Sequence, residues 1–127
     1  MIQKIALITT IVMLLVAAGL GAETKVALVI GNSDYENITA LRNPENDARD
    51  IARELRNLGF SVDVLTNASL PEMESSIIEL QNSLNRDPEG TGFFFYAGHG
   101  VQARGVNYLI PADADIQAGS QLRYRAT

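Results

Sequence analysis

The sequence contains no cysteine, no tryptophan and a single histidine among its 127 residues. Residues 1–127 therefore hold no disulfide, no thiolate metal site, no iron–sulfur cluster and no cysteine nucleophile. Basic residues are also few. Ten Lys and Arg against fifteen Asp and Glu give a net charge of −5, which makes nucleic acid an unfavourable partner. What is present, 46% hydrophobic and 20% charged residues, is typical of a folded chain with room for one domain.

Residues 1–22 have the pattern of a secretory signal peptide. Lys4 precedes an uncharged apolar run over residues 5–20, and small residues follow before Glu23. The run is shorter than the roughly 20 residues that span a bilayer, which favours a cleaved signal. We therefore expect export, to the periplasm or outside the cell, and a folded part over residues 23–127. A membrane anchor over residues 5–20 is the alternative.

Four segments of the remainder have the composition of β-strands. Residues 25–30 are almost uniformly apolar and end at Gly31-Asn32, which is typical of a strand buried on both faces. The run Phe93-Phe94-Phe95 is expected in the core. The predicted strands cover residues 25–30, 60–65, 92–96 and 106–111.

Two helices are predicted between these strands. The first begins at Asn43-Pro44, an N-cap followed by a proline, and ends before Gly59. The second begins at Ser69 and Glu72, which have the spacing of a capping box, and ends before residue 87. Strands that alternate with helices favour an α/β fold with a parallel sheet and right-handed crossovers.

The single histidine lies where such folds place their chemistry. In open α/β sheets, ligands and catalytic groups gather beyond the carboxyl ends of the strands. The segment Ala97-Gly98-His99-Gly100 follows the third strand at that place, and its glycines leave room for a substrate backbone. We therefore single out His99 as a candidate functional residue. The alternative is an ordinary loop histidine beside a glycine turn.

No motif for a phosphate or a metal ion accompanies this histidine in the sequence. The segment Gly31-Asn32-Ser33-Asp34 lacks both the dinucleotide fingerprint and the lysine of a phosphate-binding loop. Asp113 and Asp115 are similar to the start of a calcium loop, but Ala118 and Tyr124 stand where that loop needs glycine and glutamate. We therefore expect no cofactor and no metal site, and calcium activation stays an open question.

Five ordered motifs resemble the large-subunit (p20) region of the caspase-like cysteine peptidases, in particular the bacterial branch near metacaspases and paracaspases. The motifs cover residues 27–32, 41–48, 55–60, 96–100 and 107–111. The resemblance implies a three-layer α/β/α fold with a mostly parallel sheet. It also implies a cysteine-type endopeptidase that acts on protein or peptide substrates.

The resemblance also assigns roles to individual residues. In this family the histidine of the Tyr-Ala-Gly-His-Gly segment acts with a cysteine in an Asp-x-Cys motif on the next strand. His99 is then the catalytic histidine, and the N–H of Gly100 donates to the oxyanion. Asp47 matches an acidic residue of the pocket that binds a basic side chain before the cleaved bond. An ordinary charge at a helix start is the alternative for Asp47, and Arg42 keeps aspartate specificity open.

The cysteine that the resemblance requires is expected about 50 residues after the histidine, at roughly position 149. We therefore expect residues 23–127 to be the N-terminal part of a catalytic domain that ends before the cysteine-bearing strand and is inactive by itself. One alternative is a caspase-like pseudo-peptidase that binds a protein partner. Another is a Rossmann-like ligand-binding domain.

Overall fold

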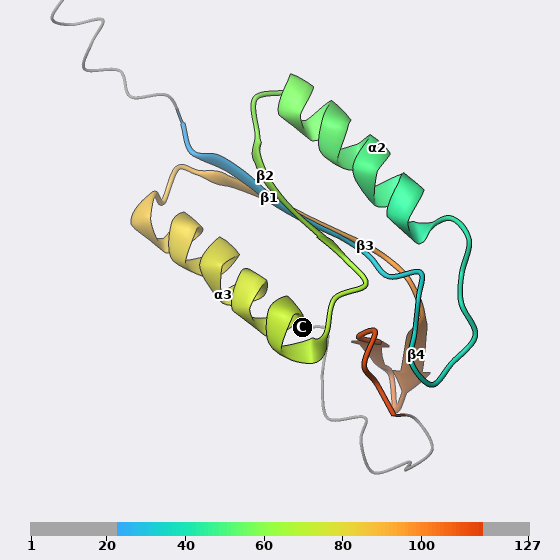
Figure 1. The fold of residues 1–127 in the computed structure, drawn as a ribbon. Helices are drawn as coiled ribbons and strands as arrows, with labels where there is room; N and C mark the ends of the chain where they lie inside the picture. The colour runs from blue at the N-terminus through green and yellow to red at the C-terminus, as the bar shows by residue number, and fades with distance from the viewer. Residues whose placement is uncertain (1–22, 116–127) are drawn as a thin grey trace, which may run out of the picture.

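A parallel β-sheet organises residues 23–115, the part of the chain that the computed structural model describes. Its strands run in the order β2-β1-β3, and both neighbouring pairs are parallel. Two helices connect the strands, and an antiparallel hairpin follows (Figure 1). The elements are β1 (Lys25–Gly31), α2 (Pro44–Asn57), β2 (Ser61–Thr66), α3 (Leu70–Arg86), β3 (Thr91–Ala97), β4 (Gly100–Ala103) and β5 (Val106–Leu109).

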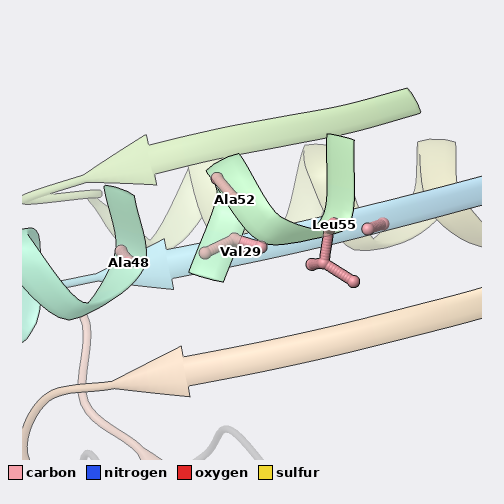
Figure 2. Close-up of a cluster of buried hydrophobic side chains, with 5 residues drawn as sticks. Val29, Ala48, Ala52 and Leu55 are labelled. Carbon is pink, nitrogen blue, oxygen red and sulfur yellow. The ribbon is translucent and has the colours of Figure 1, made fainter. Parts of the chain in front are cut away.

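The two helices cover opposite faces of the sheet (Figure 1). Successive side chains of a strand point to opposite faces, so the apolar run of β1 supplies both layers. Val29 packs under α2 beside Ala48, Ala52 and Leu55 (Figure 2). Leu28 and Ile30 pack against α3. This arrangement confirms the expected three-layer α/β/α fold with its mostly parallel sheet.

The start of α2 lies close to the end of β1. A Cβ at Gly31 would lie 2.7 Å from the Cβ of Ala48 and would collide with the carbonyl group of Pro44, so only glycine allows this approach. Asn43 occupies the predicted N-cap position, but its side chain makes no capping hydrogen bond. The hydroxyl of Ser33 takes that role instead and accepts the N–H of residue 45 at 3.2 Å.

A buried asparagine joins the segments that leave the sheet. Asn32 follows β1 and is completely buried. Its Oδ1 accepts the N–H of Ala68 at 2.9 Å, and its Nδ2 donates to the carbonyl of Ile110 at 3.4 Å. A buried amide needs such partners because an unpaired polar group costs about 1–3 kcal/mol. Asn32 therefore ties the ends of β1, β2 and the hairpin to one another.

The three phenylalanines of β3 correct the prediction that the run lies in the core. Only Phe95 packs against the cluster under α2, whereas Phe93 and Phe94 are 40% and 44% exposed. The physical reason is the place of β3 in the sheet. Within residues 23–115 it pairs with β1 alone and forms an edge of the sheet.

The hairpin after β3 turns at the predicted Arg104-Gly105. Both residues have positive φ, 52° and 77°, as a two-residue type I′ turn requires. Strand β5 was predicted at residues 106–111 and is shorter, whereas β4 was not predicted at all. Strand β4 has only four residues and begins with a glycine, so the sequence carries little local signal for a strand there.

No helix within residues 23–115 is long and apolar enough to cross a membrane. The predicted signal segment, residues 1–22, lies outside the described residues, and so do Ala118 and Tyr124.

Candidate active site

The candidate site lies where the order of the strands reverses. The chain leaves β1 toward β2 on one side and returns to β3 on the other, so the carboxyl ends of β1 and β3 are neighbours. Gly31 and Ala97 face each other in register at these ends. The residues that follow them, including Tyr35 and His99, meet beyond this edge. Such a point is the usual ligand-binding place in open α/β sheets.

The imidazole ring of His99 is held by a backbone carbonyl. Its Nε2 lies 2.8 Å from the oxygen of Thr39, in the loop between β1 and α2. A carbonyl oxygen only accepts hydrogen bonds, so Nε2 carries a hydrogen in this arrangement. In the neutral ring the lone pair is then on Nδ1. His99 thus has one fixed tautomer with Nδ1 as its basic atom.

The backbone of His99 is held by two tyrosines. Its N–H donates to the hydroxyl of Tyr35 at 2.8 Å, and its carbonyl lies 2.7 Å from the hydroxyl of Tyr96. Burial raises the pKa of Tyr96 well above its ordinary value, so this hydroxyl stays protonated and donates. A Cβ at Gly98 would lie 2.6 Å from both hydroxyl oxygens, which explains the glycine before the histidine.

Gly100 presents a backbone donor at the start of β4. It faces Leu109 across the hairpin, and the preceding pair is hydrogen-bonded because Ile110 N–H donates to the His99 carbonyl at 3.1 Å. Antiparallel pairs alternate between bonded and non-bonded, so the N–H of Gly100 points away from β5. The nearest neighbour of a Cβ at Gly100 would be the carbonyl oxygen of Tyr108 at 3.4 Å, and the residue is exposed. An N–H next to the histidine is therefore accessible to a substrate oxygen.

The loop between β1 and α2 is itself anchored to the sheet. The side chain of Asn67, a residue with a positive φ of 53°, accepts the N–H groups of Ser33 and Asp34 at 2.9 Å each. Leu41 N–H donates to the Ser33 carbonyl at 2.8 Å and closes the loop. These bonds hold the loop that carries the Tyr35 hydroxyl and the Thr39 carbonyl, the two groups that contact His99.

Asp47 lies in the first turn of α2 and is exposed. Two acidic neighbours on the same helix have basic partners, Glu45 with Arg49 at 2.9 Å and Asp50 with Arg53 at 2.8 Å. The Asp47 carboxylate makes no hydrogen bond or ion pair with any residue of the described part of the chain. His99 and Gly100 are consecutive residues at the start of the hairpin, whereas Asp47 lies on α2 and makes no hydrogen bond with His99.

The sequence patterns did not single out Tyr35, Thr39 or the role of Tyr96. One signal was present, since Tyr35 comes four residues after the end of the central strand, at the edge where His99 was expected. Residues after neighbouring parallel strands meet at that edge. Arg42, the candidate for aspartate recognition, is exposed in the same loop as Thr39.

The sequence was also compared with those of known proteins. The chain is 34% identical to human mucosa-associated lymphoid tissue lymphoma translocation protein 1 over 93 residues, which are 73% of this chain and 11% of the human protein. It is 29% identical to pig caspase-1 over 85 residues, 67% of this chain and 21% of the pig protein. The chain thus spans about a tenth to a fifth of the length of these relatives. The family model described as the caspase domain matches residues 24–124, and the chain therefore belongs to the caspase-domain family.

Proposed function

We propose that residues 23–127 form the histidine-bearing part of a cysteine endopeptidase domain and that His99 is its catalytic histidine. The observation that supports this most is the fixed ring of His99, with Nε2 on the Thr39 carbonyl and Nδ1 left as the base. The sequence has no cysteine. The nucleophile then comes from chain outside residues 1–127, in the Asp-x-Cys motif that the family resemblance implies.

The proposed reaction transfers an acyl group to that cysteine and then to water. The thiol gives its proton to His99, and the thiolate attacks the peptide carbonyl to form a carbon–sulfur bond. The resulting oxyanion accepts a hydrogen bond from Gly100 N–H. The carbon–nitrogen bond then breaks as His99 protonates the leaving amine. Water, deprotonated by His99, attacks the thioester carbonyl, which releases the acid and the thiol.

We further propose that the substrate carries Arg or Lys before the cleaved bond and that Asp47 contributes to its recognition. The support is the exposed Asp47 carboxylate, which has no basic partner within residues 23–115, unlike Glu45 and Asp50 on the same helix. A carboxylate can bind a guanidinium through two parallel hydrogen bonds. Recognition of aspartate through Arg42 is the alternative.

A catalytically inactive pseudo-peptidase is the second candidate function. The exposed Phe93 and Phe94 point to opposite faces of the edge strand and leave apolar area at this edge for a protein partner.

Expression of the reading frame through the first Asp-x-Cys motif after residue 127 separates the two functions. The peptidase proposal predicts hydrolysis of fluorogenic peptides with Arg or Lys before the cleaved bond, and loss of hydrolysis after alkylation of the thiol. Preferred hydrolysis after Asp would overturn the basic specificity and leave the peptidase in place. A reading frame without Asp-x-Cys, or one with it that cleaves no peptide, would favour the pseudo-peptidase.

We also propose that the protein is exported after cleavage near residue 22. The support is the uncharged run over residues 5–20 and the small residues that follow it. N-terminal sequencing of exported protein is expected to begin at Ala22 or Glu23. Membrane-bound protein that retains Met1 would instead support an anchor.

A further inference from the structure

The hydroxyl groups of two tyrosines form a directed set of hydrogen bonds around His99. The hydroxyl oxygen of Tyr96 lies 2.7 Å from the carbonyl oxygen of His99 and 2.9 Å from that of Ile110. This hydroxyl has a single hydrogen to donate. It therefore donates to a carbonyl, and the hydroxyl of Tyr35, 3.4 Å away, is left to donate to Tyr96. Tyr35 in turn accepts the N–H of His99 at 2.8 Å. The bonds thus begin and end at the backbone of the same histidine.

Tyr35 also contacts the imidazole itself. The two ring centroids are 4.8 Å apart, and the planes meet at 61° in an edge-to-face arrangement. Aromatic rings favour this geometry at such a distance. The same loop contributes the Thr39 carbonyl to Nε2. Three contacts from one loop therefore restrain the backbone, the plane and the tautomer of His99.

The hydroxyl of Tyr35 is not needed to hold its own loop. The loop is closed by the bond from Leu41 to Ser33 and attached to the sheet through Asn67. Among residues 23–115, the hydroxyl of Tyr35 makes hydrogen bonds only with the backbone N–H of His99 and the hydroxyl of Tyr96. The hydroxyl of Tyr35 therefore holds the backbone of His99 and the hydroxyl of Tyr96 and is not required for the structure of its own loop.

We propose that Tyr35 is a positioning residue that fixes the place and the orientation of His99 through its hydroxyl and its ring edge. The inference rests on the proposed function, because the orientation of His99 affects a reaction only if His99 transfers a proton. Proton transfer requires the basic nitrogen within hydrogen-bonding reach of the reacting group. A displacement of about 1 Å can lower a rate by about 100-fold.

The test compares Tyr35→Phe, which keeps the ring and removes the hydroxyl, with the matched control Tyr108→Phe. Tyr108 lies on β5, and its hydroxyl makes no hydrogen bond to another residue in the described part of the chain. The full chain is labelled with ¹⁵N in a Phe94→Lys background, which removes an exposed apolar side chain from the edge of β3. The signals of the imidazole need no further assignment because His99 is the only histidine. Wild type and Tyr108→Phe are expected to show mainly the Nε2–H tautomer. Tyr35→Phe is expected to keep this tautomer, because the Thr39 carbonyl still accepts a hydrogen bond from Nε2, and to show hydrogen exchange at the His99 amide about tenfold faster.

Activity of the protein extended through its Asp-x-Cys motif gives an independent measurement. Tyr35→Phe is expected to lower kcat about tenfold with KM close to that of wild type, because the hydroxyl contacts His99 and not the substrate. If no variant cleaves peptides but the His99 amide exchanges faster in Tyr35→Phe, Tyr35 positions the histidine and the proposed peptidase function is wrong.

Two results would overturn the inference. One is a Tyr35→Phe chain whose His99 amide exchanges at the wild-type rate. The other needs no variant, and therefore decides the matter even if Tyr35→Phe does not fold. It is the absence of a nuclear Overhauser effect between the Tyr35 ring and the His99 imidazole protons in the wild-type chain.

Discussion

The Nε2 atom of His99 lies 2.8 Å from the carbonyl oxygen of Thr39, a residue 60 positions earlier in the chain. This contact joins the loop after β1 to the turn after β3, the two neighbouring parallel strands at which the sheet order reverses. It fixes the hydrogen on Nε2 and leaves Nδ1 as the base. The fold therefore fixes the orientation of the His99 ring relative to the loop after β1.

The two glycines that flank His99 are expected to differ in their tolerance of a methyl group. Gly98→Ala places a Cβ 2.6 Å from the hydroxyl oxygens of Tyr35 and Tyr96 and is expected to lower the free energy of unfolding by about 1–3 kcal/mol. Gly100→Ala meets its nearest atom at 3.4 Å and is expected to change it by less than about 0.5 kcal/mol. Urea unfolding measures both. Equal losses for the two variants would contradict the tyrosine arrangement around Gly98.

Asp47→Asn tests the proposed recognition of basic substrates. In the extended protein it is expected to lower kcat/KM for Arg peptides by at least about tenfold, because a charged hydrogen bond to the guanidinium is lost. The control is Asp50→Asn on the same helix, whose carboxylate is already paired with Arg53. That variant is expected to keep wild-type kinetics. If Asp47→Asn also keeps them, Asp47 is only a favourable charge at the start of α2.

The capping box of α3 is expected to make stability depend on acidic pH. Hydrogen bonds from Ser69 lower the pKa of the Glu72 carboxyl below its usual 4.5. The folded state therefore favours the ionised carboxylate. Its contribution is present above pH 4.5 and is lost as the pH falls through the lowered value.

Glu72→Gln is expected to flatten the loss of stability below pH 4.5, measured by thermal unfolding across pH. Glu74→Gln, two residues further along α3, leaves the capping box intact and is expected to keep the wild-type slope. A wild-type slope in Glu72→Gln would show that the box does not contribute to the acid sensitivity.

The edge of β3 is expected to cause self-association of residues 23–127 when no further strand is supplied. Within the described part of the chain, β3 pairs only with β1, and Phe94 is 44% exposed. Uncharged edges of this kind act as templates for strand pairing between molecules. Sedimentation velocity is expected to show large species for wild type and fewer for Phe94→Lys. The control is Leu58→Lys, which replaces another exposed apolar side chain, 65% exposed and directly after α2, and it is expected to behave as wild type. A monomeric wild-type fragment would contradict the prediction.

The layers of the fold could be predicted because their signals are local. The apolar run of β1 indicates burial on both faces, and Ala48, Ala52 and Leu55 recur at helical spacing. The exposure of Phe93 and Phe94 could not be predicted in this way. It depends on which strand lies at the edge of the sheet, and a uniformly apolar segment looks the same at an edge and in the centre.

The site could be predicted only in part for a related reason. The position of His99 follows from the end of β3, but its contacts with Tyr35 and Thr39 join residues 64 and 60 positions apart. No spacing along the sequence encodes these pairs. They arise because β1 and β3 are neighbours, which the right-handed crossovers allow but the local pattern does not specify.

The most direct test of the central claim is the hydrolysis of an Arg peptide by the extended protein with and without His99→Ala. The account predicts that the wild-type protein cleaves the peptide and that His99→Ala lowers kcat by at least about 100-fold, the scale of a lost general acid–base group. Thermal unfolding of the same variant confirms that it is folded. Full activity in a folded His99→Ala protein would contradict the assignment of His99 as the catalytic histidine.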